Sequence, residues 1–529
     1  MKRFAAVLLL TACATSQPSD SARLKQIAGD YWQHELQRNV GLQIKFGIPT
    51  QHLPDVSYAQ AQRDADSARS LLHRLDAVRP SNLGEDERIT LGILRWENQL
   101  EVDGLQYFWY RFPVTPYTFQ FRGIAQLFRT NLNEADRRRL LGEVPRVADQ
   151  LIEVLKQEQQ RGIVLPKPEI ALVRASFTAL NIPGFERLVD FVTAQEPSAP
   201  AGIGLSQYPG GDAAYRFFIR ERTTLDLTPQ QIHELGVREV ERINGEMKQA
   251  RDSLGFKGTK AEFDQFLKTD PRFFAKTPDE VGQRLTADMH RIEPHIPQFF
   301  DREPKAKYDV QRLNPALEGS MTFGYYQQPT ATDPIGHYYY NGSKLNERNL
   351  LFAQALIAHE LIPGHHFQIA RQEENDQLLP FRREHFDTAY IEGWGEYAAA
   401  LGNEMGLYDD PYDRYGRLMM DMLLSVRLVV DTGMNAMGWS RERAADFMRD
   451  NTLLSDTEIA TETLRYAVDM PAQALAYKIG SLKMLELRRN AQQQLGPRFD
   501  VRKFHEWIIG SGSMPLPVLE QHAADEMKR

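Results

Sequence analysis

Apolar residues recur every three to four positions along most of the chain, which predicts a mainly α-helical protein. The clearest amphipathic stretches predict helices over residues 21–37, 133–159, 228–254 and 277–300. Each stretch has a residue that favours helix N-caps at its start: Ser21, Asn133, Thr228 and Thr277. The breaks between helices are short, and the clearest, 196–212, is rich in Pro, Gly and Ser. We therefore predict one helical domain over 21–529, with a subdomain junction near 196–212.

Strand-like patterning is concentrated in one region, just before residue 359. Residues 308–313, 321–326 and 337–341 carry the β-branched and aromatic side chains typical of strands. This predicts a small β element beside the helix that follows. Its edge could hold an extended peptide through backbone hydrogen bonds, or the sheet could serve packing alone.

The helix predicted to end near residue 360 carries metal-binding chemistry. In an H-E-x-x-H motif the two histidines lie about 6 Å apart along one helix face, so both reach one ion. Here 359–366 reads His-Glu-Leu-Ile-Pro-Gly-His-His, with Pro363 in place of the second histidine. His365 or His366 would lie about 9 or 10.5 Å from His359 along an ideal helix, too far for one ion. Pro363 and Gly364 predict a kink that shortens this distance, and the spacing leaves both histidines open.

A later helix, after a charged connection, offers carboxylates. Glu392, in the run 390–397, is the predicted third ligand, which leaves the fourth position open for water. Glu396 lies one turn further on the same face. It either accepts a hydrogen bond from a ligand histidine or is an ordinary ion-paired glutamate. Two imidazoles, one carboxylate and an open position suit zinc best, so one Zn²⁺ is the predicted cofactor.

Five segments resemble the bacterial family known as domain of unknown function 885, whose members look like zincin metallopeptidase lipoproteins. They are HELIPGHHFQ (359–368), EGWGEY (392–397), RLVVDTG (427–433), PAQALAYKIG (471–480) and Leu487-Arg488. The resemblance spans nearly the whole mature chain. It implies a large helical zincin-like, gluzincin-type fold and favours His365 over His366 as second ligand. Asn435 departs from the family pattern, where a histidine often stands, and this weakens any catalytic histidine there.

By resemblance to glutamate-ligand zinc peptidases, Glu360 is the predicted general base. Zinc lowers the pKa of its water to about 7, so a carboxylate beside it can take the proton at neutral pH. Tyr477 is the first candidate for a donor to the oxyanion, with Tyr466 and Tyr340 as alternatives. Each tyrosine could instead pack in the core with a satisfied hydroxyl.

Two arginines could bind a substrate carboxylate through paired hydrogen bonds, as an exopeptidase requires. Arg427 is predicted instead to pair with Asp431, one helical turn further on. Arg465 stays a candidate for substrate binding, as does Tyr340.

The N-terminus reads as a bacterial lipoprotein signal peptide over residues 1–12, with a basic start, an apolar core and the lipobox Leu10-Thr11-Ala12-Cys13. Cleavage after Ala12 would make Cys13 the lipidated first residue, with 13–20 as a tether. The alternative is an ordinary secretory signal with a chance cysteine. Ala14 favours the outer membrane, facing the periplasm. Because Cys13 is the single cysteine of the chain, an intramolecular disulfide is excluded.

Charge and composition narrow the partners. Removal of residues 1–12 takes Lys2 and Arg3 with it, which changes the formal net charge from −8 to −10. Without a basic stripe, nucleic-acid binding is not expected, and the membrane is met through the lipid anchor only. The sequence thus predicts a zinc peptidase of the cell envelope that cleaves peptides. A non-catalytic scaffold clamped by zinc, or a hydrolase of non-peptide amides or esters, are the alternatives. The sequence predicts neither whether the enzyme is an exopeptidase or an endopeptidase nor its oligomeric state.

Overall fold

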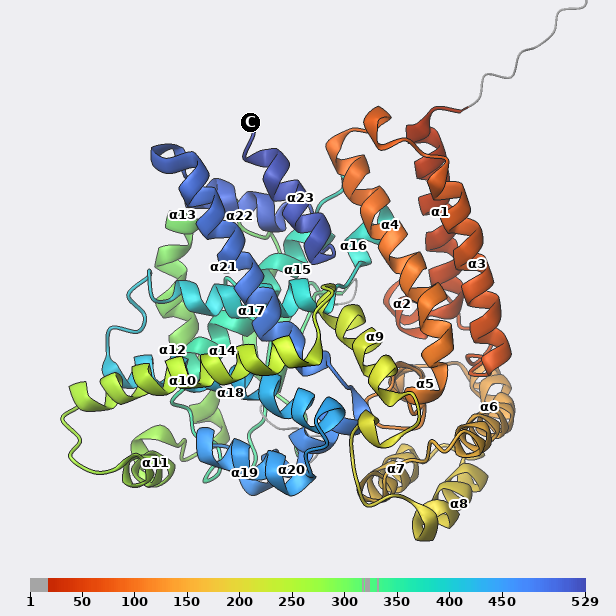
Figure 1. Ribbon diagram of the computed structural model, residues 1–529, viewed down its shortest axis with the longest axis horizontal. Coiled ribbons are helices and arrows are strands. Elements are labelled where there is room, and N and C mark those ends of the chain that lie inside the picture. Colours follow the sequence, from red (N-terminus) through yellow and green to blue (C-terminus); the bar gives the residue numbers. More distant parts are fainter. Residues whose placement is uncertain (1–17, 316–317, 319–323, 331–332) are drawn as a thin grey trace, which may run out of the picture.

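The computed structural model describes residues 18–315, 318, 324–330 and 333–529, so Cys13 and the predicted signal peptide lie outside the described residues. Helices dominate (Figure 1). Before the sheet these are α1 (Asp20–Arg38), α2 (Val40–Lys45), α3 (Tyr58–Asp76), α4 (Glu85–Gly104), α5 (Phe119–Arg129), α6 (Glu134–Gln160), α7 (Lys167–Leu180), α8 (Glu186–Gln195), α9 (Gly211–Thr223), α10 (Pro229–Ser253), α11 (Lys260–Thr269), α12 (Pro278–Ile292) and α13 (Ile296–Phe299). After it follow α14 (Ala353–Glu360), α15 (His365–Glu373), α16 (Pro380–Glu384), α17 (Thr388–Leu401), α18 (Pro411–Ala436), α19 (Arg441–Asn451), α20 (Asp456–Leu464), α21 (Ala476–Leu495), α22 (Val501–Ile509) and α23 (Leu516–Glu526). The predicted mainly α class is confirmed.

Side-chain caps explain where the long helices begin. Three predicted caps accept a hydrogen bond from the first helical turn: Asn133 at α6, Thr228 at α10 and Thr277 at α12. At α1 the cap is Ser19, so the prediction of Ser21 is wrong. The helical stretch predicted over 277–300 is divided in the structure: α12 ends at Ile292, a 3-10 turn spans Glu293–His295, and α13 continues to Phe299. Pro294, which has no N–H for a helical hydrogen bond, lies in the dividing turn.

Three short strands form the sheet: β1 (Lys307–Arg312), β2 (Gly324–Gln327) and β3 (Ile335–Tyr340). Their order is β1-β3-β2, with β3 parallel to β1 and antiparallel to β2. Residues 321–323 of the predicted second strand lie outside the described residues. The sheet packs closely on α15, since a Cβ on Gly336 would come within 2.3 Å of His366 Nδ1. The predicted β element therefore lies where the sequence placed it, beside the histidine segment.

Two hydrophobic clusters fill the interior. One joins α5 to α10 with α18 to α20, and the other joins α1, α3, α4 and α12 with α14, α15, α17 and α21 to α23. The segment 196–212, predicted as a subdomain junction, packs onto α18. Its Leu205 is fully buried and donates its backbone N–H to Asn435 Oδ1 at 3.1 Å. Helices α14 and α17 lie near the middle of the molecule (Figure 1).

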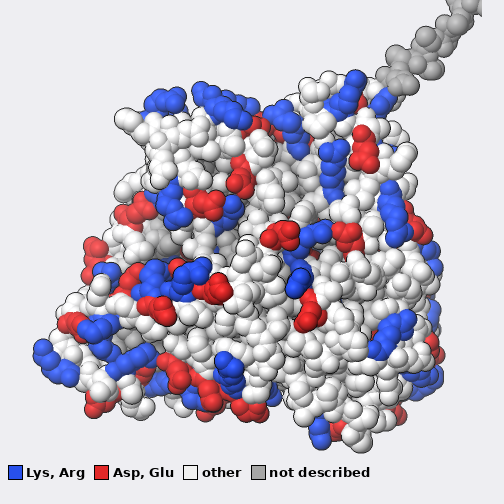
Figure 2. All heavy atoms as spheres, in the orientation of Figure 1, with Lys and Arg blue, Asp and Glu red and all other residues white. Residues whose placement is uncertain are grey.

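The surface carries charges of both signs. On the face drawn in Figure 2, basic and acidic side chains are interspersed. Many form ion pairs along one helix, such as Arg242 with Glu246 at 2.6 Å. No helix in the described part of the chain is both long enough and apolar enough to cross a membrane.

Helices α17 and α21 pack at unusually short range because both carry glycine where they meet. A Cβ on Gly393 would lie 2.5 Å from the backbone carbon of Gly480. A Cβ on Gly480 would lie 1.9 Å from the carbonyl oxygen of Ala389. Neither contact is with a movable side chain, so any side chain at these positions separates the helices.

Gly480→Ala should therefore destabilise the protein by about 1–3 kcal/mol, the usual cost of an overpacked core. Gly29→Ala is the matched control, because a Cβ at Gly29 on α1 meets nothing within 4 Å. Alanine in a helix interior should raise stability there by about 0.5–1 kcal/mol. Chemical denaturation of both variants measures this, and equal midpoints would contradict the close packing.

Candidate metal centre

The helix that carries His359 ends one residue later. α14 stops at Glu360 and α15 starts at His365, so the predicted kink is a complete interruption over residues 361–364. Gly364 is required in this turn, because a Cβ there would lie 1.8 Å from the carbonyl oxygen of His359. Across this interruption the rings of His359 and His365 lie 4.6 Å apart between centroids.

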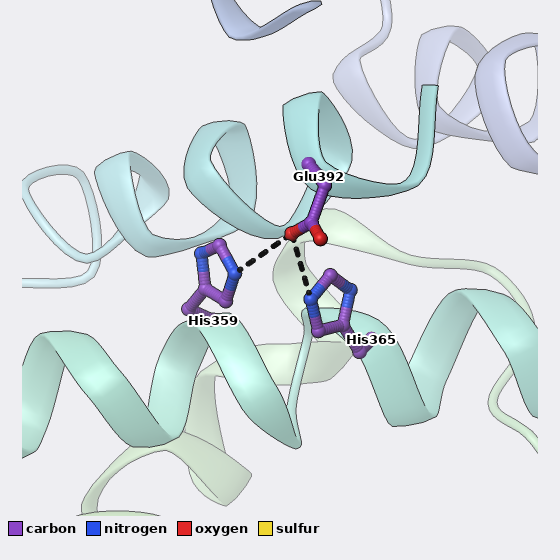
Figure 3. A group of neighbouring side chains, drawn as sticks. All are labelled: His359, His365 and Glu392. Carbon is purple, nitrogen blue, oxygen red and sulfur yellow. Dashed lines mark ion pairs between the residues drawn. The ribbon is translucent and has the colours of Figure 1, made fainter. Parts of the chain in front are cut away.

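Glu392 of α17 points between the two rings (Figure 3). Its Oε2 lies 3.6 Å from His359 Nε2 and 3.3 Å from His365 Nε2. Ligand atoms of a tetrahedral zinc site are about 3.3–3.4 Å apart, since each lies about 2.0–2.1 Å from the ion. The three donor atoms all lie within 4.8 Å of one another and are of the types that zinc prefers. The described residues thus fit one zinc ion held by His359, His365 and Glu392.

Trp394 and Gly395, which follow Glu392 on α17, both shape the site. Trp394 donates its indole N–H to the carbonyl of Pro363 at 2.9 Å, which ties α17 to the interrupting turn. Gly395 leaves space for both imidazoles, because a Cβ there would lie 2.9 Å from His359 Cε1 and 3.0 Å from His365 Cε1. The segment 392–395 therefore positions the ligands as well as supplying one.

Glu396 lies behind His359. One carboxylate oxygen accepts a hydrogen bond from Arg417 at 2.5 Å, and the other lies 3.9 Å from His359 Nδ1 and has no hydrogen-bond partner. Burial raises the pKa of Glu396, with the Arg417 charge opposing it. This is the placement expected of a carboxylate that orients a ligand imidazole, although the distance is longer than a hydrogen bond.

His366 faces away from the cluster. Its Nε2 lies 3.1 Å from the carbonyl oxygen of Ala306, and its Nδ1 lies 3.1 Å from the hydroxyl of Tyr326. Burial lowers the pKa of His366 to about 4. Of the two histidines that the spacing left open, the structure brings His365 to Glu392.

Protonation in the cluster follows from burial and from the mutual charges. Burial and the neighbouring His365 lower the pKa of His359 to about 4. Burial would lower the pKa of His365 as well, but hydrogen bonding and the charge of Glu392 raise it. Burial opposes ionisation of Glu392, yet the two imidazoles hold its pKa far below the usual range. A neutral His359 beside an ionised Glu392 is the state that cation binding requires.

Glu360 and Tyr477 face a cavity of about 200 Å³ that reaches His359. The Tyr326 backbone N–H donates to the Glu360 carboxylate, and burial raises the pKa of Glu360 to about 7. The ring of Tyr477 lies nearly parallel to that of His359, at 18° and 6.2 Å between centroids. The base and the first oxyanion candidate predicted from sequence therefore lie with the ligand cluster.

Sequence reasoning missed Tyr338, which lines the same cavity. Burial and the charge of Glu360 raise its pKa well above the ordinary value. Tyr340, the predicted candidate, packs against α12 instead, where a Cβ on Gly282 would meet its hydroxyl at 2.7 Å. Strand alternation places Tyr338 and Tyr340 on the same face. The sequence therefore indicates that a tyrosine of this face could reach the site, but it does not indicate which of the two.

The remaining candidates lie in a buried network. Tyr466 is fully buried and bonds to Glu462 and Arg427. Arg465 donates to Glu462 at 3.2 Å and to Gln473 at 2.6 Å, and it is not among the residues that line the cavity.

The predicted ion pair between Arg427 and Asp431 is wrong. Arg427 pairs with Glu462 at 3.0 Å and lines the cavity. Asp431 accepts hydrogen bonds from Tyr215 at 2.7 Å and Asn435 at 3.1 Å. Partners distant in sequence therefore decide the pairing of both side chains.

The chain matches the family model described as bacterial protein of unknown function (DUF885) over residues 38–182 and 171–522. These two segments together span most of the sequence. The chain belongs to the DUF885 family. No curated protein matches it at a significant level.

Two solved structures share the fold of this DUF885 protein. A predicted lipoprotein from Colwellia psychrerythraea has a TM-score of 0.87 at 22% identity, covering 96% of this chain and 99% of that one. A predicted lipoprotein of unknown function from Shewanella oneidensis has a TM-score of 0.72 at 19% identity, with the same coverage. At these identities the likeness concerns the fold alone.

His365→Ala should weaken zinc binding far more than His366→Ala. Removing a group that only orients a ligand costs about 10–100-fold in affinity, and removing a ligand should cost more. His366→Ala is the matched control, since it deletes a neighbouring buried imidazole that points elsewhere. Competition with a chromophoric chelator measures both affinities. Equal losses in the two variants, or a larger loss in His366→Ala, would contradict the assignment.

Proposed function

We propose that the protein is a zinc-dependent hydrolase that cleaves peptide bonds, with a zincin-like arrangement of the gluzincin type. One observation carries the proposal: two imidazoles and a carboxylate converge at the end of the cavity that also holds Glu360 and Tyr477. A zinc ion bound there would supply a Lewis acid that polarises a carbonyl and lowers the pKa of water.

The residues of the chain have defined tasks in this proposal. Glu360 takes the proton of the attacking water and passes it to the leaving amine, because its side chain lies in the cavity beside His359 and forms no salt bridge with a described residue. In this proposal Tyr477, which lines the same cavity, donates its hydroxyl to the carbonyl oxygen as negative charge develops there. The edge strand β2 contributes Gly324 to the cavity wall, where an extended substrate could pair with its backbone.

The composition of the cluster favours catalysis over a zinc-clamped scaffold. Structural zinc sites normally use four protein ligands, whereas catalytic sites keep a position open. Among the described residues, His359, His365 and Glu392 form a group of three, and Glu396 is engaged by Arg417. A non-peptide amide or ester hydrolase would use the same residues and is the second candidate.

Glu360→Gln should abolish turnover and keep the metal. The amide has nearly the shape of the carboxylate but cannot accept the proton, and such general bases contribute about 10²–10⁴-fold. Glu234→Gln on the exposed face of α10 is the matched control. Zinc content by mass spectrometry and cleavage of a mixed peptide library test both variants.

The outcomes of this experiment separate the alternatives. Zinc in all proteins with cleavage by all except Glu360→Gln supports the peptidase. A wild type that contains zinc but cleaves no peptide would contradict the peptidase and favour a zinc-clamped scaffold or a hydrolase of a non-peptide substrate. Absence of zinc from the wild type would refute the metal site.

We also propose that the protein is a lipoprotein of the bacterial envelope, anchored through Cys13 at the outer membrane and facing the periplasm. The lipobox 10–13 supports this, as do the two related structures, both from predicted lipoproteins. Cys13→Ser should move the protein from the membrane fraction to the soluble fraction of a cell lysate. Retention of the variant in the membrane fraction would contradict the anchor.

A further inference from the structure

Arg427 is a buried cation, and one of its two terminal amino groups has no hydrogen-bond partner among the described residues. Its Nε donates to the hydroxyl of Tyr466 at 2.7 Å, and its Nη2 donates to Glu462 at 3.0 Å. Nη1 forms no hydrogen bond with any described residue, and the side chain, which is 11% exposed, lines the cavity. A buried guanidinium normally satisfies its donors, so the free amino group marks a place for an acceptor inside the cavity.

Among the described residues, Glu462 is the one carboxylate within salt-bridge distance of Arg427. Glu462 also accepts a hydrogen bond from Arg465 at 3.2 Å, so two guanidinium groups share one carboxylate. Arg465 takes its other hydrogen bond to the neutral amide of Gln473. Asp431, the carboxylate one turn away, is held by Tyr215 instead. Asp431 and Asp469 also act on the charge of Arg465. Arg427 thus shares its one paired carboxylate with a second cation, and an anion in the cavity would stabilise its buried charge further.

The distance between the Arg427 guanidinium and His359 limits the number of residues between a bound carboxylate and the cleaved bond. The guanidinium carbon of Arg427 lies 5.0 Å from the centre of the Tyr477 ring. The Tyr477 ring in turn lies 6.2 Å from the His359 ring. The two distances together place the guanidinium within about 11 Å of the His359 ring. One residue of extended chain spans about 3.3–3.6 Å, so a carboxylate bound at Arg427 would lie within about three residues of a bond cleaved beside His359.

The wall beside these groups is apolar. It consists of side chains from α14, α18 and the segment after α19: Leu356, Met419, Leu423, Leu424, Leu453 and Leu454. Besides Arg427, the charged residues of the cavity lining are Lys260, Asp264, Glu347, Glu360 and Glu458. The side chains of Lys260 and Glu347 are 40% and 46% exposed. The apolar side chains of the wall therefore suit a large apolar side chain next to a carboxylate, whereas Lys260 and Glu347 are open to solvent.

We propose that Arg427 binds the terminal carboxylate of the substrate, so that the protein removes residues from the C-terminus of peptides that end in a large apolar residue. This assignment rests on the proposed peptidase function and names its substrate class. Water adds across the last peptide bond, which releases the C-terminal apolar amino acid, or across the bond before it, which releases a dipeptide with that residue at its end.

The test compares acetyl-Ala-Ala-Leu with its C-terminal amide on wild type and Arg427→Gln. Because hydrogen bonds to a charged group contribute about 1.5–3 kcal/mol, amidation should lower kcat/KM of the wild type about 10–100-fold. Arg427→Gln should cleave the acid and the amide about equally. Wild type that cleaves both equally, or that cuts internal bonds of longer peptides, would overturn the proposal.

A binding measurement separates this proposal from the peptidase itself. Titration calorimetry of Glu360→Gln should show tighter binding of the acid than of the amide, and the added Arg427→Gln change should remove the difference. That result would support the carboxylate site even if no peptide were cleaved, whereas equal affinities would refute it. Arg427→Lys guards against misfolding, because it keeps the charge and should restore part of the preference for the acid.

Discussion

The end of α14 directly after His359 is the constraint on which the rest of the site depends. In a continuous helix, His359 and His365 would point in different directions and lie about 9 Å apart along the axis. The turn at 361–364 removes that separation, and Gly364 and the bond from Trp394 to Pro363 hold the turn in place. The ligand from α17 then meets both histidines because Gly395 presents no side chain to them.

Local sequence features predicted those parts of the site that depend on neighbouring residues. The helical class, three of the four caps and the break at Pro363-Gly364 all follow from short-range rules. The convergence of His359 with Glu392 was predicted as well, since known zinc sites take a carboxylate from a later helix. The spacing left His365 and His366 open, because the choice depends on how far the chain turns after Glu360, and it was the resemblance to the DUF885 family that favoured His365.

Features set by distant residues were not predictable in the same way. Arg427 was assigned to Asp431 because helical spacing permits that pair, but the structure provides Glu462 and Tyr466 from the end of α20 and the turn after it. Tyr338 and Tyr340 share one strand face, and only the packing of β3 on α12 separates their surroundings. In both cases the deciding contact joins segments tens of residues apart.

The bond between Trp394 and Pro363 also bears on how the centre can move. It connects the helix that carries Glu392 to the turn that carries the chain from His359 to His365, and Gly393 fixes the same helix against α21. These elements should therefore shift as one rigid body. Entry and exit of a bound molecule would then depend on movement of the cavity wall formed by residues 451–454, at the end of α19 and directly after it.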